Sequence, residues 1–186
     1  VTVKFTVKTR PALSIGLNPG WNLISLPAAP ADPDINAVIP STHSINHVVT
    51  YDADGNPVTA TRVNGLLEGG VTTIDSNTAY YVHTESFQAL SVTLASADPG
   101  APAPRPQVLN LSAGWNLIPV LSADPAVGGT STVDADEYLP AGCVRVFAWS
   151  TLSDKYTGQS CTAGTLSVGS GYWVYMSKSG DILAGS

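Results

Sequence analysis

The stretch Leu17–Ile24 reads LNPGWNLI, and LSAGWNLI at Leu111–Ile118 repeats it 94 residues further along the chain. A second match follows in the same order at an offset of 92 residues, TAYYVH at 78–83 and SGYWVY at 170–175. Between them lies a looser pair, 47–52 and 143–149. Matches that recur in one order and nearly one register are the signature of an internal repeat. The sequence therefore predicts two modules related by internal duplication.

Within each module, apolar and polar residues alternate with the period of a β-strand. Trp21 and Leu23 point to one side and Asn22 and Ile24 to the other, and Pro27 ends the run. Helical patterns are confined to short turns at 34–39 and 134–139, each followed by proline. We therefore expect an all-β fold made of two tandem small antiparallel β-sandwich or barrel modules.

A proline-rich segment separates the two predicted modules. Four prolines fall within residues 98–106, which predicts a semi-rigid linker that holds a module at 14–97 apart from a module at 107–186. Residues 1–13 lie outside both repeats. Because the chain begins with Val1 rather than Met, we interpret it as a processed mature chain or a fragment of a longer one.

The first eight residues alternate cleanly, so they predict a further strand. Its apolar face consists of Val1, Val3, Phe5 and Val7. This strand can join the first module, complete a preceding domain, or add to the sheet edge of a neighbouring molecule. Pairing within the chain is the favoured interpretation, since sequential strands tend to be neighbours.

Composition narrows the class of partner and the compartment. The chain has 186 residues, 12% of them charged, and a net charge of −6, which disfavours nucleic acid and anionic lipid. No apolar run is long enough to cross a bilayer. Cys143 and Cys161 form no metal-binding pattern, so a disulfide in an oxidising, extracellular setting is favoured over two buried thiols.

Two copies of a GWNLI strand, at 20–24 and 114–118, and a GYWV strand at 171–174 together resemble a β module of bacterial and archaeal secreted and cell-surface proteins. The resemblance covers nearly all of both halves and implies a non-catalytic structural or accessory unit found in tandem. No catalytic motif comes with it. The second copy departs from the pattern after Ile118, where Pro119 replaces serine.

Five aromatic residues are candidates for a sugar-stacking surface or for core packing: Trp21, Trp115, Trp149, Tyr172 and Trp173. Trp21 and Trp115 hold the same place in each repeat, so we expect equivalent internal packing, and core positions for at least three of the five. Tyr172 and Trp173 point to opposite faces of their strand. One of these two is therefore the candidate ligand surface.

Calcium has one weak candidate site, formed by Asp52, Asp54 and Asn56 at alternate positions. The glutamate that closes such a loop is missing, and Asp54-Gly55 is a strong hairpin-turn signal, so the hairpin is favoured. Asn110 begins a glycosylation tripeptide, to which we give little weight.

The three histidines, His43, His47 and His83, lack a zinc-binding pattern, and we expect solvated or turn histidines. No catalytic residues and no cofactor are predicted.

The sequence thus favours a non-enzymatic extracellular or cell-surface structural protein, a building block of a surface layer, stalk or filament. Its expected partners are copies of itself or neighbouring surface-protein domains, and assembly by strand addition through residues 1–8 is a sharper version of this hypothesis. A carbohydrate-binding or adhesive module of a larger secreted protein is the alternative.

Overall fold

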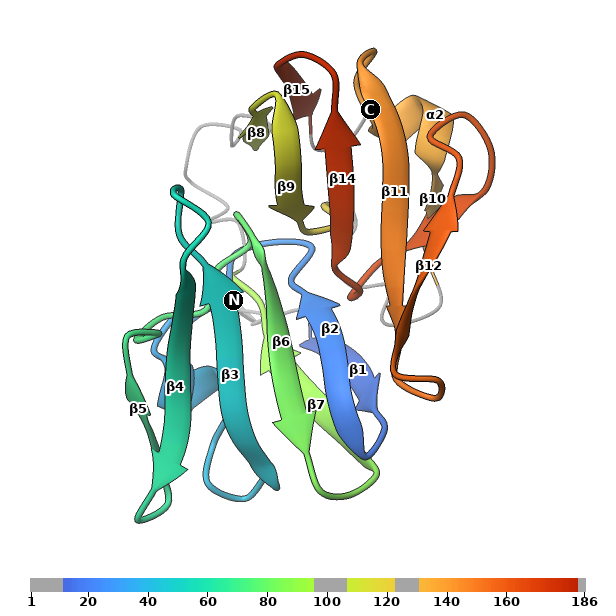
Figure 1. The fold of residues 1–186 in the computed structure, drawn as a ribbon. Coiled ribbons are helices and arrows are strands. Elements are labelled where there is room, and N and C mark those ends of the chain that lie inside the picture. The colour runs from blue at the N-terminus through green and yellow to red at the C-terminus, as the bar shows by residue number, and fades with distance from the viewer. Residues whose placement is uncertain (1–11, 96–106, 123–130, 184–186) are drawn as a thin grey trace, which may run out of the picture.

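The computed structural model describes residues 12–95, 107–122 and 131–183, and short strands account for most of them (Figure 1). The first half contains β1 (Ala12–Leu17), β2 (Gly20–Ser25), α1 (Ile35–Val38), β3 (Ile45–Tyr51), β4 (Pro57–Val63), β5 (Leu66–Gly69), β6 (Ala79–Thr84) and β7 (Gln88–Thr93). The second half contains β8 (Val108–Leu111), β9 (Gly114–Ile118), β10 (Thr132–Asp134), α2 (Ala135–Tyr138), β11 (Cys143–Ser150), β12 (Lys155–Gln159), β13 (Thr165–Ser167), β14 (Tyr172–Met176) and β15 (Gly180–Leu183). These strands pair antiparallel, which confirms the predicted all-β fold class.

Each half combines one larger sheet with two-stranded sheets. The larger sheets have the strand orders β2-β6-β3-β4-β5 and β9-β14-β11-β12, and the smaller sheets are β1-β7, β8-β15 and β10-β13. The first four strands of the two larger sheets correspond position by position, so the looser sequence pair lies on β3 and β11. The internal duplication itself and the domain boundaries stay predictions.

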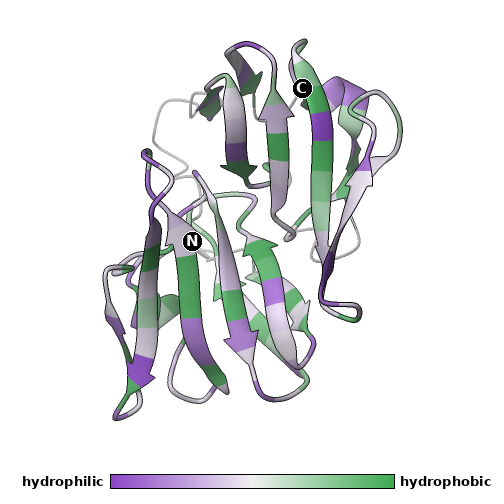
Figure 2. Cartoon of the chain, in the orientation of Figure 1, coloured by the Kyte–Doolittle hydropathy of each residue, from purple (hydrophilic) through white to green (hydrophobic). Residues whose placement is uncertain are grey.

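Alternating side chains give each half its own core, and Figure 2 shows the corresponding bands of hydropathy along the strands. The first core includes Leu13 of β1, Leu90 of β7, and Ile24, Val48 and Val82 of the larger sheet. The second core includes Leu111 of β8, Ile182 of β15, and Ile118, Val146 and Val174 of the larger sheet. Each core therefore lies between a larger sheet and the two-stranded sheets of the same half, and among the described residues each core draws its members from one half only.

The repeated motif forms the turn that connects a strand of a two-stranded sheet to the edge strand of the larger sheet in each half. Gly20 has a φ of 100°, which favours glycine. Asn22 Oδ1 accepts the Asn18 N–H at 3.0 Å, and Asn22 Nδ2 donates to the Asn18 and Gly20 carbonyls at 2.8 and 3.1 Å. In the second half Asn116 makes the same three bonds to Ser112 and Gly114, at 3.0, 2.8 and 3.1 Å, and Gly114 has a φ of 99°. The motif is therefore a turn clamp made by its glycine and asparagine.

Both short helical turns lie where the sequence predicts them, and each ends before a proline. Asp34 caps α1, since its side chain accepts the Asn36 N–H at 2.8 Å. Neither α1 nor α2 exceeds four residues, and the described part of the chain holds no helix able to cross a membrane.

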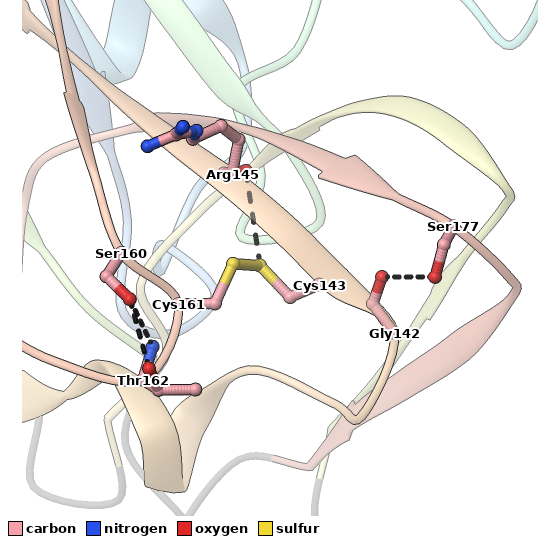
Figure 3. The surroundings of a disulfide bond; sticks show 7 residues. All are labelled: Gly142, Cys143, Arg145, Ser160, Cys161, Thr162 and Ser177. Atoms are coloured by element: carbon pink, nitrogen blue, oxygen red, sulfur yellow. Dashed lines mark hydrogen bonds between the residues drawn. A yellow bond between two sulfur atoms is a disulfide. The ribbon is translucent and has the colours of Figure 1, made fainter.

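The predicted disulfide joins Cys143, at the start of β11, to Cys161, in the loop after β12, with their Cα atoms 5.9 Å apart (Figure 3). It closes a segment with a sequence separation of 18, which stabilises the fold by about 3 kcal/mol in the chain-entropy model. The proposed strand-addition residues Val1, Val3, Phe5 and Val7, and the linker at 98–106, lie outside the described residues.

Replacing the clamp residue tests its role in the fold. Asn22→Ala removes the three hydrogen bonds that a buried side chain makes to the partly buried backbone of Asn18 and Gly20, so we expect the free energy of unfolding to fall by about 2 kcal/mol. Asn116→Ala removes the same bonds at a more exposed site and should cost about half as much. Urea unfolding measures both values. A loss below about 0.5 kcal/mol for Asn22→Ala would contradict the clamp.

Candidate functional site

The two larger sheets carry aromatic side chains on the faces that point away from their cores. Eleven such rings come from seven strands: Trp21, His47, Tyr51, Tyr81, His83, Trp115, Phe147, Trp149, Tyr156, Trp173 and Tyr175. This placement follows from strand periodicity, because the residues between them enter the cores. The candidate site is therefore built on the outer faces, across both halves of the chain.

A third apolar cluster joins the halves. Its buried members are Leu23, Ala79 and Tyr81, and partly buried Trp21, Val49, Leu117, Trp149 and Trp173 pack against them. Two indole groups donate hydrogen bonds across this contact, Trp149 Nε1 to the Trp21 carbonyl and Trp173 Nε1 to Tyr81 Oη, both at 2.7 Å. The outer faces of the two sheets thus meet through tryptophan and tyrosine side chains.

Main-chain hydrogen bonds also cross the contact, because the loop before β14 pairs with β2. The Ser25 N–H donates to the Gly169 carbonyl at 2.9 Å, and the Gly171 N–H donates to the Leu23 carbonyl at 3.1 Å. The buried Ser25 hydroxyl donates to the Ser170 carbonyl at 2.7 Å. The expectation that the linker holds the modules apart is therefore wrong, because described residues of the two halves are hydrogen-bonded to each other.

Gly171 permits this close approach. A Cβ atom at Gly171 would lie 3.0 Å from Leu23 Cγ and still closer to Ala79 Cβ, both in the first half. Real Cβ atoms do not approach other atoms so closely. The absence of a side chain at this position is therefore a condition for the junction.

Gly171→Ala tests the junction. The added methyl group must separate β2 from the loop, and we expect a loss of about 1–3 kcal/mol in the free energy of unfolding. Tryptophan emission should shift to longer wavelength as water reaches Trp149 and Trp173. Gly16→Ala is the matched control, because a Cβ there meets nothing within 4 Å. Equal stability and equal emission for both variants would refute the junction.

An aromatic groove opens beside the junction, a hollow of about 550 Å³ lined by Tyr51, Gly55, Trp115, Phe147, Tyr156 and Trp173. The Trp115 and Trp173 rings stand at 86° with centroids 6.4 Å apart, and Trp115 is 57% exposed. Phe147 lies over Gly158 of β12, where a Cβ would meet its ring at 3.1 Å. The groove thus has fixed aromatic walls and one tryptophan open to solvent.

A polar hollow of about 470 Å³ adjoins the groove and shares Tyr51, Gly55, Trp115 and Trp173 with it. Its polar side chains are Asp52, Asn77, Thr78, Asn110, Ser112 and Asn116. Hydrogen bonds from the Asn56 backbone and side chain lower the pKa of Asp52 below its ordinary value. The Asp52 carboxylate is therefore ionised at neutral pH. A ligand spanning both hollows meets aromatic rings on one side and amide, hydroxyl and carboxylate groups on the other.

A third hollow, of about 250 Å³, continues past Tyr51 and Tyr156 toward Trp21, Tyr81 and Trp149. Tyr51 lines all three hollows and Tyr156 lines two of them. The shared residues make the three hollows neighbours, and their combined lining comes from both halves of the chain.

The structure corrects the expected roles of the tryptophans. Trp21 and Trp115 hold the same strand position, but Trp21 packs in the junction while Trp115 is mostly exposed, so they do not share an internal packing role. Trp149 and Trp173 also lie outside the two main cores. The expectation of packed positions for at least three of the five aromatic residues agrees with the structure, because Tyr172 lies in the second core and Trp21, Trp149 and Trp173 pack against the third cluster.

Tyr172 and Trp173 do point to opposite faces, as predicted. Tyr172 is buried in the second core, where its hydroxyl accepts the Ser167 N–H at 2.9 Å, so it is not a ligand residue. Tyr80 is its counterpart in the first core and accepts the Asp75 N–H at 3.1 Å. Of the two predicted surface residues, Trp173 alone lines the groove.

The segment with the weak calcium pattern forms a hairpin turn between β3 and β4. Asp52 Oδ1 accepts the N–H groups of Asp54 and Asn56 at 3.0 and 2.8 Å, and Gly55 has a φ of 82°. Among the described residues, no group of three or more histidine, cysteine, aspartate or glutamate side chains is placed to hold a metal ion.

The structure brings the His47 and His83 rings together on neighbouring strands. The ring nitrogens of His47 and His83 lie 3.1 and 2.8 Å from Asn46 Oδ1, and their ring centroids are 6.3 Å apart. The His43 ring instead bonds the Ala89 carbonyl at 3.2 Å.

Sequence reasoning missed Tyr51, Phe147 and Tyr156. Alternation from Trp149 along β11 could have placed Phe147 on the same face. Tyr156 joins the site because it pairs with Trp149 in the β11–β12 register, with ring centroids 4.9 Å apart. The register of the β11–β12 pair depends on how the two strands align, which the local sequence does not show.

A scan against protein-family models and searches of curated proteins and of solved structures find no match to this chain. The resemblance to a secreted β module therefore stays a prediction, and the site is interpreted from its own geometry.

Proposed function

We propose that the chain is a non-enzymatic, extracellular glycan-binding protein whose aromatic groove stacks on sugar rings. The observation that carries this proposal is Trp115, a tryptophan 57% exposed on the outer face of a sheet, beside Trp173 and next to a polar hollow. Exposed aromatic surface of this kind marks interaction sites.

A pyranose ring suits a groove with these two sides. Its C–H faces are apolar and stack on aromatic rings, and its rim of hydroxyl groups both donates and accepts hydrogen bonds. Trp115 and Phe147 offer the apolar wall, while Asn110, Thr78 and Asp52 line the adjoining hollow. Binding sites commonly combine apolar lining with a few polar groups that fix the ligand.

The disulfide between Cys143 and Cys161 supports an extracellular location, because such bonds persist in oxidising compartments. The low share of charged residues, 12%, and the net charge of −6 fit a protein whose ligand is not a polyanion.

Trp115→Ala tests the proposal. Affinity electrophoresis through gels that contain soluble polysaccharides measures retardation of the folded protein. We expect the parent chain to be retarded by at least one polysaccharide, and Trp115→Ala to weaken that binding about tenfold or more, since stacking on an aromatic ring contributes on the order of 1–3 kcal/mol. Phe87→Ala is the matched control, because Phe87 is 74% exposed and lies outside all three hollows. Equal losses in the two variants, or no retardation of the parent chain, would count against glycan binding.

A structural role in a surface layer, stalk or filament is the second candidate. Two observations favour it: β5 and β12 end the larger sheets in the described part of the chain, and the sequence of residues 1–8 has the alternation of an added strand.

Deleting residues 1–10 tests assembly by strand addition. If the added strand comes from a neighbouring molecule, the truncated chain loses the assemblies that electron microscopy shows for the full chain. Identical assemblies from both chains would exclude this mechanism.

A further inference from the structure

Three polar groups form a chain that ends at the groove. Trp173 Nε1 of β14 donates to Tyr81 Oη of β6 at 2.7 Å, and Tyr81 Oη is hydrogen-bonded to Tyr156 Oη of β12. The three residues come from three strands and both halves of the chain, so the junction fixes their relative positions.

The direction of these hydrogen bonds follows from burial. An indole N–H is only a donor, so Tyr81 Oη must accept from Trp173. Tyr81 is buried, and burial together with the Tyr156 hydrogen bond raises the pKa of its hydroxyl above the ordinary value, so the group keeps its proton. Its own hydrogen needs an acceptor, because an unpaired buried donor is costly. Tyr156 Oη is the acceptor that the described contacts supply, and Tyr81 therefore donates to Tyr156.

The reverse direction is less favourable. If Tyr156 donated to Tyr81, the buried Tyr81 hydroxyl would accept twice, and its hydrogen would have no partner among the described contacts. Tyr156 is 46% exposed, so its own hydrogen can instead be directed into the open groove that it lines. The groove thus presents one oriented O–H donor beside its aromatic walls.

Charge further restricts the ligand. Among the described residues that line the three hollows, Asp52 is the only charged side chain. Arg145 lies opposite Tyr175 in the β11–β14 register, and neither residue lines a hollow. A carboxylate without a cationic neighbour in the lining repels uronates and sulfated sugars, and leaves neutral sugars unaffected.

We propose that the groove selects neutral polysaccharides, with the Tyr156 O–H donating to a ring or hydroxyl oxygen of the sugar that stacks on Trp115. Tyr156 is then a specificity-determining residue, and Tyr81 and Trp173 orient its hydroxyl. This inference rests on the proposed glycan-binding function and names the ligand class and a donor for that same site.

Tyr156→Phe tests the donor while keeping the ring. Affinity electrophoresis with xyloglucan, glucomannan and laminarin as neutral probes and polygalacturonate as the acidic probe gives the preference of the parent chain, and we expect retention by a neutral probe only. Tyr156→Phe should weaken that binding about tenfold, the effect of losing one oriented hydrogen bond to a ligand. Tyr175→Phe is the matched control, since it removes a tyrosine hydroxyl from the same face outside the hollows. Urea unfolding of each variant separates loss of affinity from loss of fold.

The possible results distinguish the two proposals. Binding that is lost in Trp115→Ala but unchanged in Tyr156→Phe overturns the donor and leaves glycan binding in place. Preference for polygalacturonate overturns the neutral ligand class. If no polysaccharide binds, or if a proline-rich peptide with the sequence of residues 98–106 binds in their place, glycan binding and the inference built on it both fail.

Discussion

The candidate site depends on the main-chain pairing of β2 with the loop before β14. These hydrogen bonds fix the angle between two sheets that otherwise have separate cores. Tyr51 belongs to the first half, while Trp115, Phe147 and Trp173 belong to the second, so the groove has all its walls only while the halves stay joined. The constraint is steric as well as polar, because the loop reaches Leu23 only without a side chain at Gly171.

The same contact explains why one repeated motif has two environments. In both copies glycine and asparagine clamp a turn between two sheets, and the tryptophan between them points away from the core. The outer face of β2 is covered by the second half, so Trp21 becomes part of the junction. No described residue covers the corresponding face of β9 to the same degree, and Trp115 stays mostly exposed. Local structure is thus repeated, while exposure depends on what packs against each copy.

Sequence patterns predicted much of the fold because strand alternation, prolines and the Asp-Gly turn are local signals. They placed β2, β9 and β14, both helical turns, the hairpin after Tyr51 and the disulfide. They could not identify the outer face, because β2 carries large apolar residues on both sides, with Trp21 and Leu23 opposite Ile24. Proline density describes the stiffness of a linker, but it does not determine whether the joined modules bond to each other.

Several of the rings that line the aromatic groove meet edge to face. Trp115 contacts Trp173 at 86°, and the Tyr51 and Trp173 rings meet at 67°. Edge-to-face contacts are favourable in themselves and cover less ring area than parallel stacking, which would bury both faces against each other. The main-chain pairing between the two halves and the edge contacts between the rings therefore hold the aromatic walls of the groove apart and exposed to water. The side chains of the site are already ordered in the folded chain, so a ligand loses little free energy in ordering them when it binds. This preorganisation favours tight binding from few contacts.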